Sequence, residues 1–361
     1  MLSFQLALAC AATIGFAAHR ASLCNVRAVA EVMSQGSAHM LGSLLQAAAW
    51  ATLVSGAWFV LGGHALAGVR TPPAVGWAVG GGWLFGVGAA INGGCSLSTL
   101  HRLADGELGM LATLLGLMLG VTLDLHLAPW VGSARPLTWL QEPPLWQQWP
   151  AAAPWMLVVL VLWAVNRALA LRKLASEASH LPWRARALRP TYPLAVSAAL
   201  IGSCAGFLYT SQGAWSYTNH LRTSVLHLWT GSATPPPGQT LLVVALVVGM
   251  IGSAWQRGSL AWRWPTAPSQ AVRHLMGGVL MGAGAALIPG GNDTLLLNTL
   301  PTLAMQAVIA YLALLTGIAS VLWLMHRAHL PMPAVACGPD GCSERAVQSR
   351  GRSGQEASHA P

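Results

Sequence analysis

The chain has 361 residues, of which 54% are hydrophobic and only 8% are charged. Soluble domains carry roughly 25% charged residues, so a soluble fold is excluded and a lipid bilayer is expected to cover most of the surface. The net charge of +9 is spread over short loops rather than clustered, which argues against a nucleic-acid partner. The 17 Trp residues also fit a membrane protein, because indole rings favour the membrane interface.

Apolar segments follow one another along the whole chain. A helix that crosses a bilayer core needs about 20 apolar residues. The sequence therefore predicts an all-α polytopic membrane protein with about nine transmembrane helices and additional short half-helices. The expected spans are 2–19, 40–61, 74–91, 109–127, 152–171, 191–209, 239–256, 271–289 and 303–325.

Basic residues predict the orientation. Arg and Lys gather after the fifth, seventh and ninth spans, whereas the loops 128–150, 210–238 and 290–302 carry few. The positive-inside rule then places the N-terminus outside and the C-terminus in the cytoplasm. Residues 1–330 form the expected transport domain. Residues 331–361 are polar and aperiodic, and are expected to be a disordered cytoplasmic tail.

Two pairs of similar segments suggest an internal repeat. GFAAHRASLCNVR begins at Gly15 and GFLYTSQGAWSYT at Gly206, while GVGAAINGGCSLS begins at Gly86 and GAGAALIPGGNDT at Gly282. An odd number of predicted spans separates the copies, so the second copy would be inverted. We expect repeats over about 1–128 and 191–327, with the span 152–171 between them. Transporters with inverted repeats place their sites between the halves; chance similarity of Gly/Ala-rich helices is the alternative.

The motif GGCS interrupts an apolar span. The span breaks at Gly93 and Gly94, and Ser96 is expected to cap a short helix that ends near Gly106. Open N–H groups and the dipole at a helix N-terminus suit an anion. Cys95 lies at this position, where its weak, polarizable thiol could contact a soft sulfur atom. Alternatively, Cys95 is a small buried hydrophobic residue.

A similar break surrounds Cys24, which lies between Arg20 and Arg27 in RASLCNVR. Both Arg side chains could stabilise an anion or a thiolate. Alternatively, they are ordinary positive-inside charges.

The second half keeps a glycine pair, Gly290 and Gly291, followed by Asn292 or Asp293 as a helix cap. In the repeat alignment Cys95 matches Gly291, and Cys24 matches Trp215. The loops 92–96 and 289–293 are expected to meet near mid-membrane, because such backbone needs a protein-lined or aqueous interior.

The remaining cysteines are weaker candidates. Cys10 and Cys204 lie within apolar spans and are interpreted as packing residues. Cys337 and Cys342 form CGPDGC in the tail, either as a dithiol that passes sulfur or as incidental cysteines. The sequence carries no recognisable phosphate loop, catalytic triad, metal-ligand set or cofactor motif, so an enzyme is not expected.

These motifs resemble the YeeE/YedE family of sulfur transport proteins, which includes bacterial thiosulfate transporters. The resemblance covers about residues 1–327 and rests on GFAAHRASLCNVRAVAEV, GVGAAINGGCSLSTLHRLADGELG and GAGAALIPGGNDTLLLNTLP. It implies a protein of the bacterial cytoplasmic (inner) membrane with an hourglass-like interior. It also implies thiosulfate uptake by weak thiol–sulfur hydrogen bonds, often with a TusA-like cytoplasmic sulfur carrier as partner.

By this resemblance Cys24 and Cys95 fill two family thiol positions, and the third falls at Gly291. That departure leaves another sulfur or selenium species open as the substrate. A membrane sulfurtransferase with Cys95 as nucleophile is a second hypothesis, although no acid or His lies within three residues of Cys95 to activate it. A membrane subunit that anchors a partner through its tail is a third.

Overall fold

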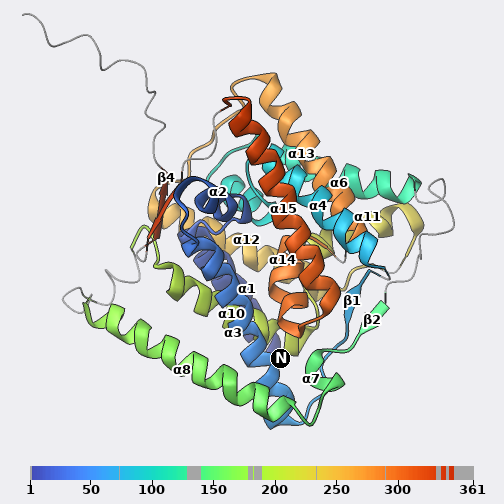
Figure 1. Cartoon of the computed structure of the whole chain (residues 1–361). Helices are drawn as coiled ribbons and strands as arrows, with labels where there is room; N and C mark the ends of the chain where they lie inside the picture. The colour runs from blue at the N-terminus through green and yellow to red at the C-terminus, as the bar shows by residue number, and fades with distance from the viewer. Residues whose placement is uncertain are drawn as a thin grey trace, which may run out of the picture.

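The computed structural model describes residues 2–72, 74–127, 140–177, 182, 189–232, 234–288, 290–330, 335–338 and 341–344. Helices dominate it (Figure 1). The first half contains α1 (Leu2–Ala21), α2 (Asn25–Gln35), α3 (His39–Gly62), α4 (Val75–Asn92), α5 (Ser96–Ala104) and α6 (Met110–Leu127). Two helices follow, α7 (Leu145–Gln148) and α8 (Ala153–Glu177). The second half contains α10 (Leu194–Gln212), α11 (Tyr217–Thr230), α12 (Pro237–Arg257), α13 (Pro268–Leu287), α14 (Asn292–Thr294), the π-helix η1 (Leu295–Thr299), the 3-10 helix η2 (Leu300–Thr302) and α15 (Met305–Arg327).

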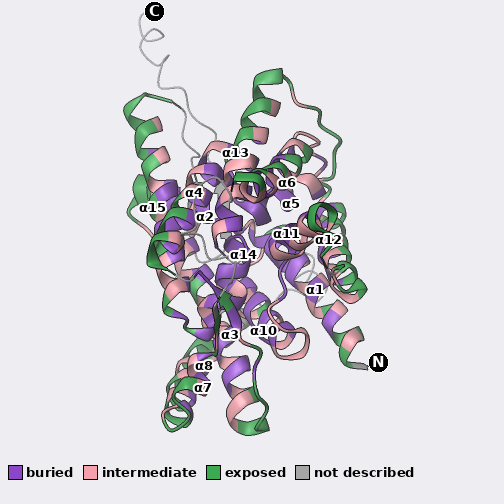
Figure 2. Ribbon diagram, turned by 90° about the vertical axis from the view of Figure 1, so that its right-hand side faces the viewer, coloured by how far each residue is buried: buried purple, intermediate pink, exposed green. Residues whose placement is uncertain are grey.

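The all-α membrane fold is confirmed, but the number of nine spans is not. Within the described residues, seven helices are long and apolar enough to cross a membrane, or eight if α13 and the bent segment after it form one span. Each of the nine predicted segments falls on a helix, but the glycine-rich α4 is not among those that qualify. Buried residues gather around α14 in the centre, and exposed residues lie on the outer helices (Figure 2). The outermost, α8, exposes apolar residues such as Val159 and Leu162, as a lipid-facing helix would.

The helices pack in pairs that repeat between the two halves. α1 packs on α12, and α10 packs on α3; α4 packs on α15, and α13 packs on α6. α1 also contacts α10, and α4 contacts α13. If α1–α6 are matched in order with α10–α15, the contact α1–α12 corresponds to α10–α3, and the contact α4–α15 corresponds to α13–α6. The contacts α1–α10 and α4–α13 each correspond to themselves. The packing therefore has the exchange pattern of a twofold relation, with α8 outside it.

Short helices follow four breaks in the long ones. α4 ends at Gly93, whose φ of +78° favours glycine, and α5 begins after it. The equivalent break after α13 contains Gly290 at φ +114°, and the chain bends there by 47°. α2 follows α1, and α11 follows α10, after comparable interruptions. These four breaks place backbone N–H groups in the interior.

Two small two-stranded antiparallel sheets complete the described structure. β1 (Val69–Thr71) pairs with β2 (Leu140–Glu142), and β3 (Val335–Gly338) pairs with β4 (Gly341–Glu344). Most of the predicted disordered tail, 331–361, lies outside the described residues. Within its described part, Cys337 is disulfide-bonded and stands opposite Cys342 in strand register, and β3 contacts α2.

Candidate functional site

Four short helices begin in the interior of the bundle. Their N-cap residues are Cys24 for α2, Cys95 for α5, Ser216 for α11 and Gly291 for α14. The predicted cap Ser96 is therefore wrong by one residue, because Cys95 has the extended backbone of an N-cap, with φ −73° and ψ 176°. Neither cysteine offers a side-chain oxygen to cap its helix, so the backbone N–H groups of Arg27 and Ser98 meet only the weakly accepting thiols of Cys24 and Cys95.

The two predicted thiols lie together. Cys24 and Cys95 hydrogen-bond through their side chains and are 2% and 1% exposed. Both line one small interior cavity, which we call the thiol cavity, together with Asn25, Asn292, Asp293 and several aliphatic residues. The cavity measures about 20 Å³, which is room for about one water molecule, so a polyatomic anion needs a wider state.

One residue that lines the thiol cavity carries an unsatisfied donor. Asn25 accepts a hydrogen bond from the hydroxyl of Tyr311 at 2.9 Å. Its amide nitrogen is buried and has no hydrogen-bond partner among the described residues. Buried donors are almost always paired in proteins, so an orphan donor beside two thiols marks a place where an acceptor can bind.

The two glycine-rich breaks meet at this cavity. Ser96 Oγ donates to Asn292 Oδ1 at 2.5 Å, and the Tyr217 hydroxyl donates to the Ser96 carbonyl at 3.0 Å. The predicted approach of the loops around 92–96 and 290–293 is therefore present, with Pro289 outside the described residues. Gly93 and Gly94 shape the first break, and the Asn92 amide bonds the Gly94 carbonyl at 2.9 Å.

Gly291 is closely surrounded. Its N–H donates to Thr218 Oγ1 at 2.8 Å. A Cβ at this position would lie 2.9 Å from Thr218 Cγ2 and 3.0 Å from Phe85 Cε2. Thr218 also donates its N–H and its hydroxyl to the carboxylate of Asp293. Thr218 and Phe85 thus fill the space beside Gly291, where the resemblance implies a third thiol.

The two predicted arginines have different environments. Arg27 interacts electrostatically with Cys24 and hydrogen-bonds it through the backbone. Arg20 is 1% exposed and does not line the thiol cavity. Its guanidinium donates to Ser253 at 3.0 Å and to Gln256 at 2.9 Å. Arg27 does not line the cavity either, and it lies within electrostatic reach of His101, whose ring contacts that of His19. The two arginines therefore differ in their direct partners.

Arg20 belongs to a polar cluster at the ends of α1, α5 and α12. His19 bridges Ser253 and Asp105, at 2.9 and 3.1 Å. Ser259 donates to Asp105 at 2.5 Å. Burial disfavours ionisation of Asp105, but the hydrogen bonds from His19 and Ser259 outweigh it and lower the pKa of this carboxyl. The cluster ties three helix ends together.

Cys10 and Cys204 form a second thiol pair. Their side chains hydrogen-bond between α1 and α10, both are partly buried, and neither lines the thiol cavity. The residues that sequence reasoning missed are Asn25, Tyr217, Thr218 and Tyr311. Tyr217 and Thr218 lie in GAWSYT, the second-half copy of the Cys24 motif, so the repeat contained a signal for them.

Comparison with known proteins agrees with this architecture. The thiosulfate transporter TsuA of Spirochaeta thermophila is 24% identical over 267 residues, which cover 68% of this chain and 77% of that protein. The model of the sulphur transport family matches residues 20–320, a range that includes both glycine-rich breaks and both thiols of the cavity. The chain therefore belongs to the sulphur transport family of multi-pass membrane proteins.

Proposed function

We propose that this protein takes up thiosulfate and passes it along a central path by weak contacts with Cys24 and Cys95. The observation that carries the proposal is the contact between these thiols in one interior cavity, beside the unpaired amide of Asn25. The thiols come from two different half-helices and are held by the tertiary packing alone. Membership of the sulphur transport family supports a sulfur anion as the substrate class.

The chemistry suits a permeating ion rather than a tightly bound one. A thiol is a weak donor and a polarizable neighbour, so it can contact the terminal sulfur of thiosulfate and release it again. The N-termini of α2 and α5 add partial positive charge without a fixed cation in the cavity. Two thiols, rather than three, provide the relay, because Gly291 takes the third position. A related sulfur or selenium anion is the alternative cargo.

The proposal includes a topology. The exchange pattern of helix contacts supports two inverted repeats, about 1–128 and 191–327, with the half-helices at their interface. The basic residues support an N-terminus outside and a cytoplasmic C-terminus in a bacterial inner membrane. A TusA-like sulfur carrier on the cytoplasmic side is the proposed acceptor of the imported ion.

Uptake of radiolabelled thiosulfate into proteoliposomes tests the function. The wild type should accumulate label. Cys95→Ala should reduce the rate about tenfold or more, because a hydrogen bond to a charged group is lost. Cys95→Ser should recover little, since a hydroxyl is a harder and stronger partner than a thiol.

Cys10→Ala is the matched control, because it removes a thiol from a contacting pair that does not line the cavity. Its uptake should match that of the wild type. Equal rates for wild type, Cys95→Ala and Cys95→Ser would refute the relay. Release of sulfite that depends on an added acceptor thiol, without accumulation of intact thiosulfate, would favour the membrane sulfurtransferase.

A further inference from the structure

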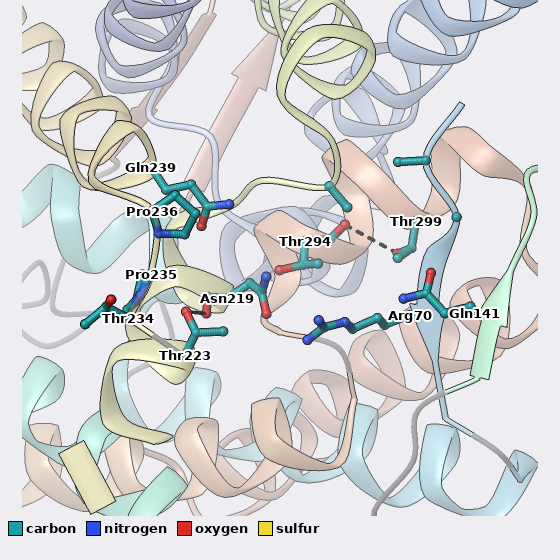
Figure 3. A pocket seen from close by; sticks show the side chains of 13 residues that line it. Arg70, Gln141, Asn219, Thr223, Thr234, Pro235, Pro236, Gln239, Thr294 and Thr299 are labelled. Atoms are coloured by element: carbon teal, nitrogen blue, oxygen red, sulfur yellow. Dashed lines mark hydrogen bonds between the residues drawn. The ribbon is translucent and has the colours of Figure 1, made fainter. Parts of the chain in front are cut away.

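A second and much larger cavity lies away from the thiols. It measures about 500 Å³ and lies between β1, β2, α11, the start of α12 and the segment α14–η1 (Figure 3). We call it the vestibule. It is lined by Ala67, Gly68, Arg70, Gln141, Ala214, Asn219, Thr223, Thr234, Pro235, Pro236, Gln239, Thr294 and Thr299. By the predicted orientation it opens on the outer side.

The lining has the chemistry of an oxyanion site. Arg70 reaches from β1 across the vestibule toward Asn219 (Figure 3), and it is the charged residue of the lining. Gln141 adds an amide donor from β2, whereas the hydroxyl of Thr223 donates to carbonyl groups of its own helix, those of Asn219 and His220. No carboxylate lines the vestibule in the part of the chain that the structure describes. A guanidinium offers two parallel N–H groups, which match two oxygens of one anion.

The surroundings increase the positive potential. α12 is a helix of 21 residues whose N-cap, Pro236, lines the vestibule and makes no side-chain cap hydrogen bond. Its first turn therefore presents the positive end of the helix dipole. Arg222 of α11 is buried and lies within electrostatic reach of Arg70, while Asp124 of α6 partly balances Arg222.

The vestibule and the thiol cavity are lined by neighbouring residues of α14. Thr294 lines the vestibule, and its hydroxyl lies 2.5 Å from Ser216 Oγ and 3.2 Å from Thr218 Oγ1. Asp293, the neighbour of Thr294 in the chain, lines the thiol cavity. The hydroxyl groups of Ser216, Thr218 and Thr294 therefore form a polar cluster beside the place where the two linings come together.

We propose that the vestibule is a capture site for the sulfonate end of the incoming anion, with Arg70 as its principal ligand. This inference rests on the proposed function. No thiol lines the vestibule among the described residues. The vestibule would therefore recognise the charge and the oxygen atoms of the anion, and not its terminal sulfur. Recognition then occurs in two stages. The vestibule binds oxyanions in general, and Cys95 then selects those that carry a terminal sulfur. Sulfate, which has the oxygens but lacks the terminal sulfur, should bind the vestibule without being transported.

Uptake kinetics with sulfate as competitor test the inference. In the wild type, sulfate should inhibit thiosulfate uptake competitively. Arg70→Gln should raise KM about tenfold with Vmax largely retained, because one charged hydrogen-bonding partner is lost. It should also abolish inhibition by sulfate, and Arg70→Lys should be intermediate. Arg273→Gln, an exposed arginine of α13 outside the vestibule, should leave KM and inhibition unchanged.

Failure of this inference is distinguishable from failure of the proposed function. If Arg70→Gln keeps the wild-type KM and sulfate inhibition while Cys95→Ala still loses uptake, the vestibule is not the capture site and the relay stands. If the wild type shows no thiosulfate uptake, the vestibule can still be tested by itself. The measurement is the rise in the unfolding midpoint of the purified protein when sulfate is added. A shift lost in Arg70→Gln and kept in Arg273→Gln supports the site; equal shifts in all three proteins overturn it.

Discussion

Cysteine at a helix N-cap has a consequence that serine would not have. Ser, Thr, Asp and Asn at this position accept a hydrogen bond from the first-turn N–H groups and so satisfy them. Cys24 and Cys95 present sulfur there, a weak acceptor that the backbone N–H groups of Arg27 and Ser98 contact, so the first-turn donors of α2 and α5 lie beside the thiols without a strong oxygen cap. One residue type therefore supplies a soft contact and leaves a partly positive helix end available.

Gly291 stands where the resemblance implies a third thiol, so we asked whether a cysteine would fit at this position. Its φ of −90° is open to any residue, so space alone limits substitution. A Cβ would lie 2.9 Å from the Thr218 methyl group. We expect Gly291→Cys to lower the stability of the purified protein by about 1–3 kcal/mol, the usual cost of overpacking, measured as a lower unfolding midpoint.

A companion substitution makes this prediction specific. Thr218→Ser removes the crowding methyl group but keeps the hydroxyl that bonds Gly291 and Asp293. Adding it to Gly291→Cys should recover part of the lost stability. An unfolding midpoint of Gly291→Cys equal to that of the wild type would show that Thr218 and Phe85 do not crowd this position.

At the scale of elements, the long helices approach through glycine. Gly86 of α4 faces α15 so closely that a Cβ would lie 2.1 Å from the carbonyl oxygen of Leu314. Gly80 lies on the same helix, is exposed and has no atom within 4 Å of the corresponding position. Small residues allow such close backbone contact, which membrane helices use because hydrophobicity gives them no drive to associate.

This contrast predicts opposite outcomes for two identical substitutions in one helix. Gly86→Ala should destabilise the protein by about 1–3 kcal/mol, because the α4–α15 backbones must move apart. Gly80→Ala should be neutral or slightly stabilising, since alanine favours a helix by about 1 kcal/mol over glycine. Thermal unfolding in detergent measures both. Equal effects of the two substitutions would contradict the close packing of α4 on α15.

At the scale of the whole molecule, the two cavities differ in size. The vestibule is large enough for an ion, whereas the thiol cavity holds about one water molecule, so the proposed path is closed at the thiols. The paired contacts of the two halves suggest how this closure could change, because motion of one half against the other would open one side first.

The proposed orientation predicts which loops reagents reach from outside. His64, after α3, and Trp262, after α12, are both exposed. In a background with Cys337→Ser and Cys342→Ser, His64→Cys should react with a membrane-impermeant thiol reagent on intact cells. Trp262→Cys should react only after permeabilisation. The background protein without either new cysteine is the control, and the reverse pattern would mean an inverted molecule.

Much of the architecture was predictable from the sequence because its signals are local. Apolar runs predicted the helices, and glycine pairs predicted the breaks at Gly93 and Gly290. The two inverted repeats suggested by the repeated motifs stay a prediction. The same motifs named both thiols of the cavity. Boundaries were less certain, as the shift of the N-cap from Ser96 to Cys95 shows, because capping depends on backbone angles that composition does not encode.

Only the tertiary structure decided which of these residues meet. Cys24 and Cys95 lie on different half-helices, and their contact depends on how α2 and α5 pack against the rest of the bundle. Arg20 and Arg27 looked equivalent in the sequence, yet helix packing places Arg20 with Ser253 and Gln256 and leaves Arg27 near Cys24. The vestibule draws Arg70 and Thr294 from opposite halves. Hydropathy and glycine spacing act over a few residues, whereas these contacts join segments far apart in the chain, so only the packed backbone can specify them.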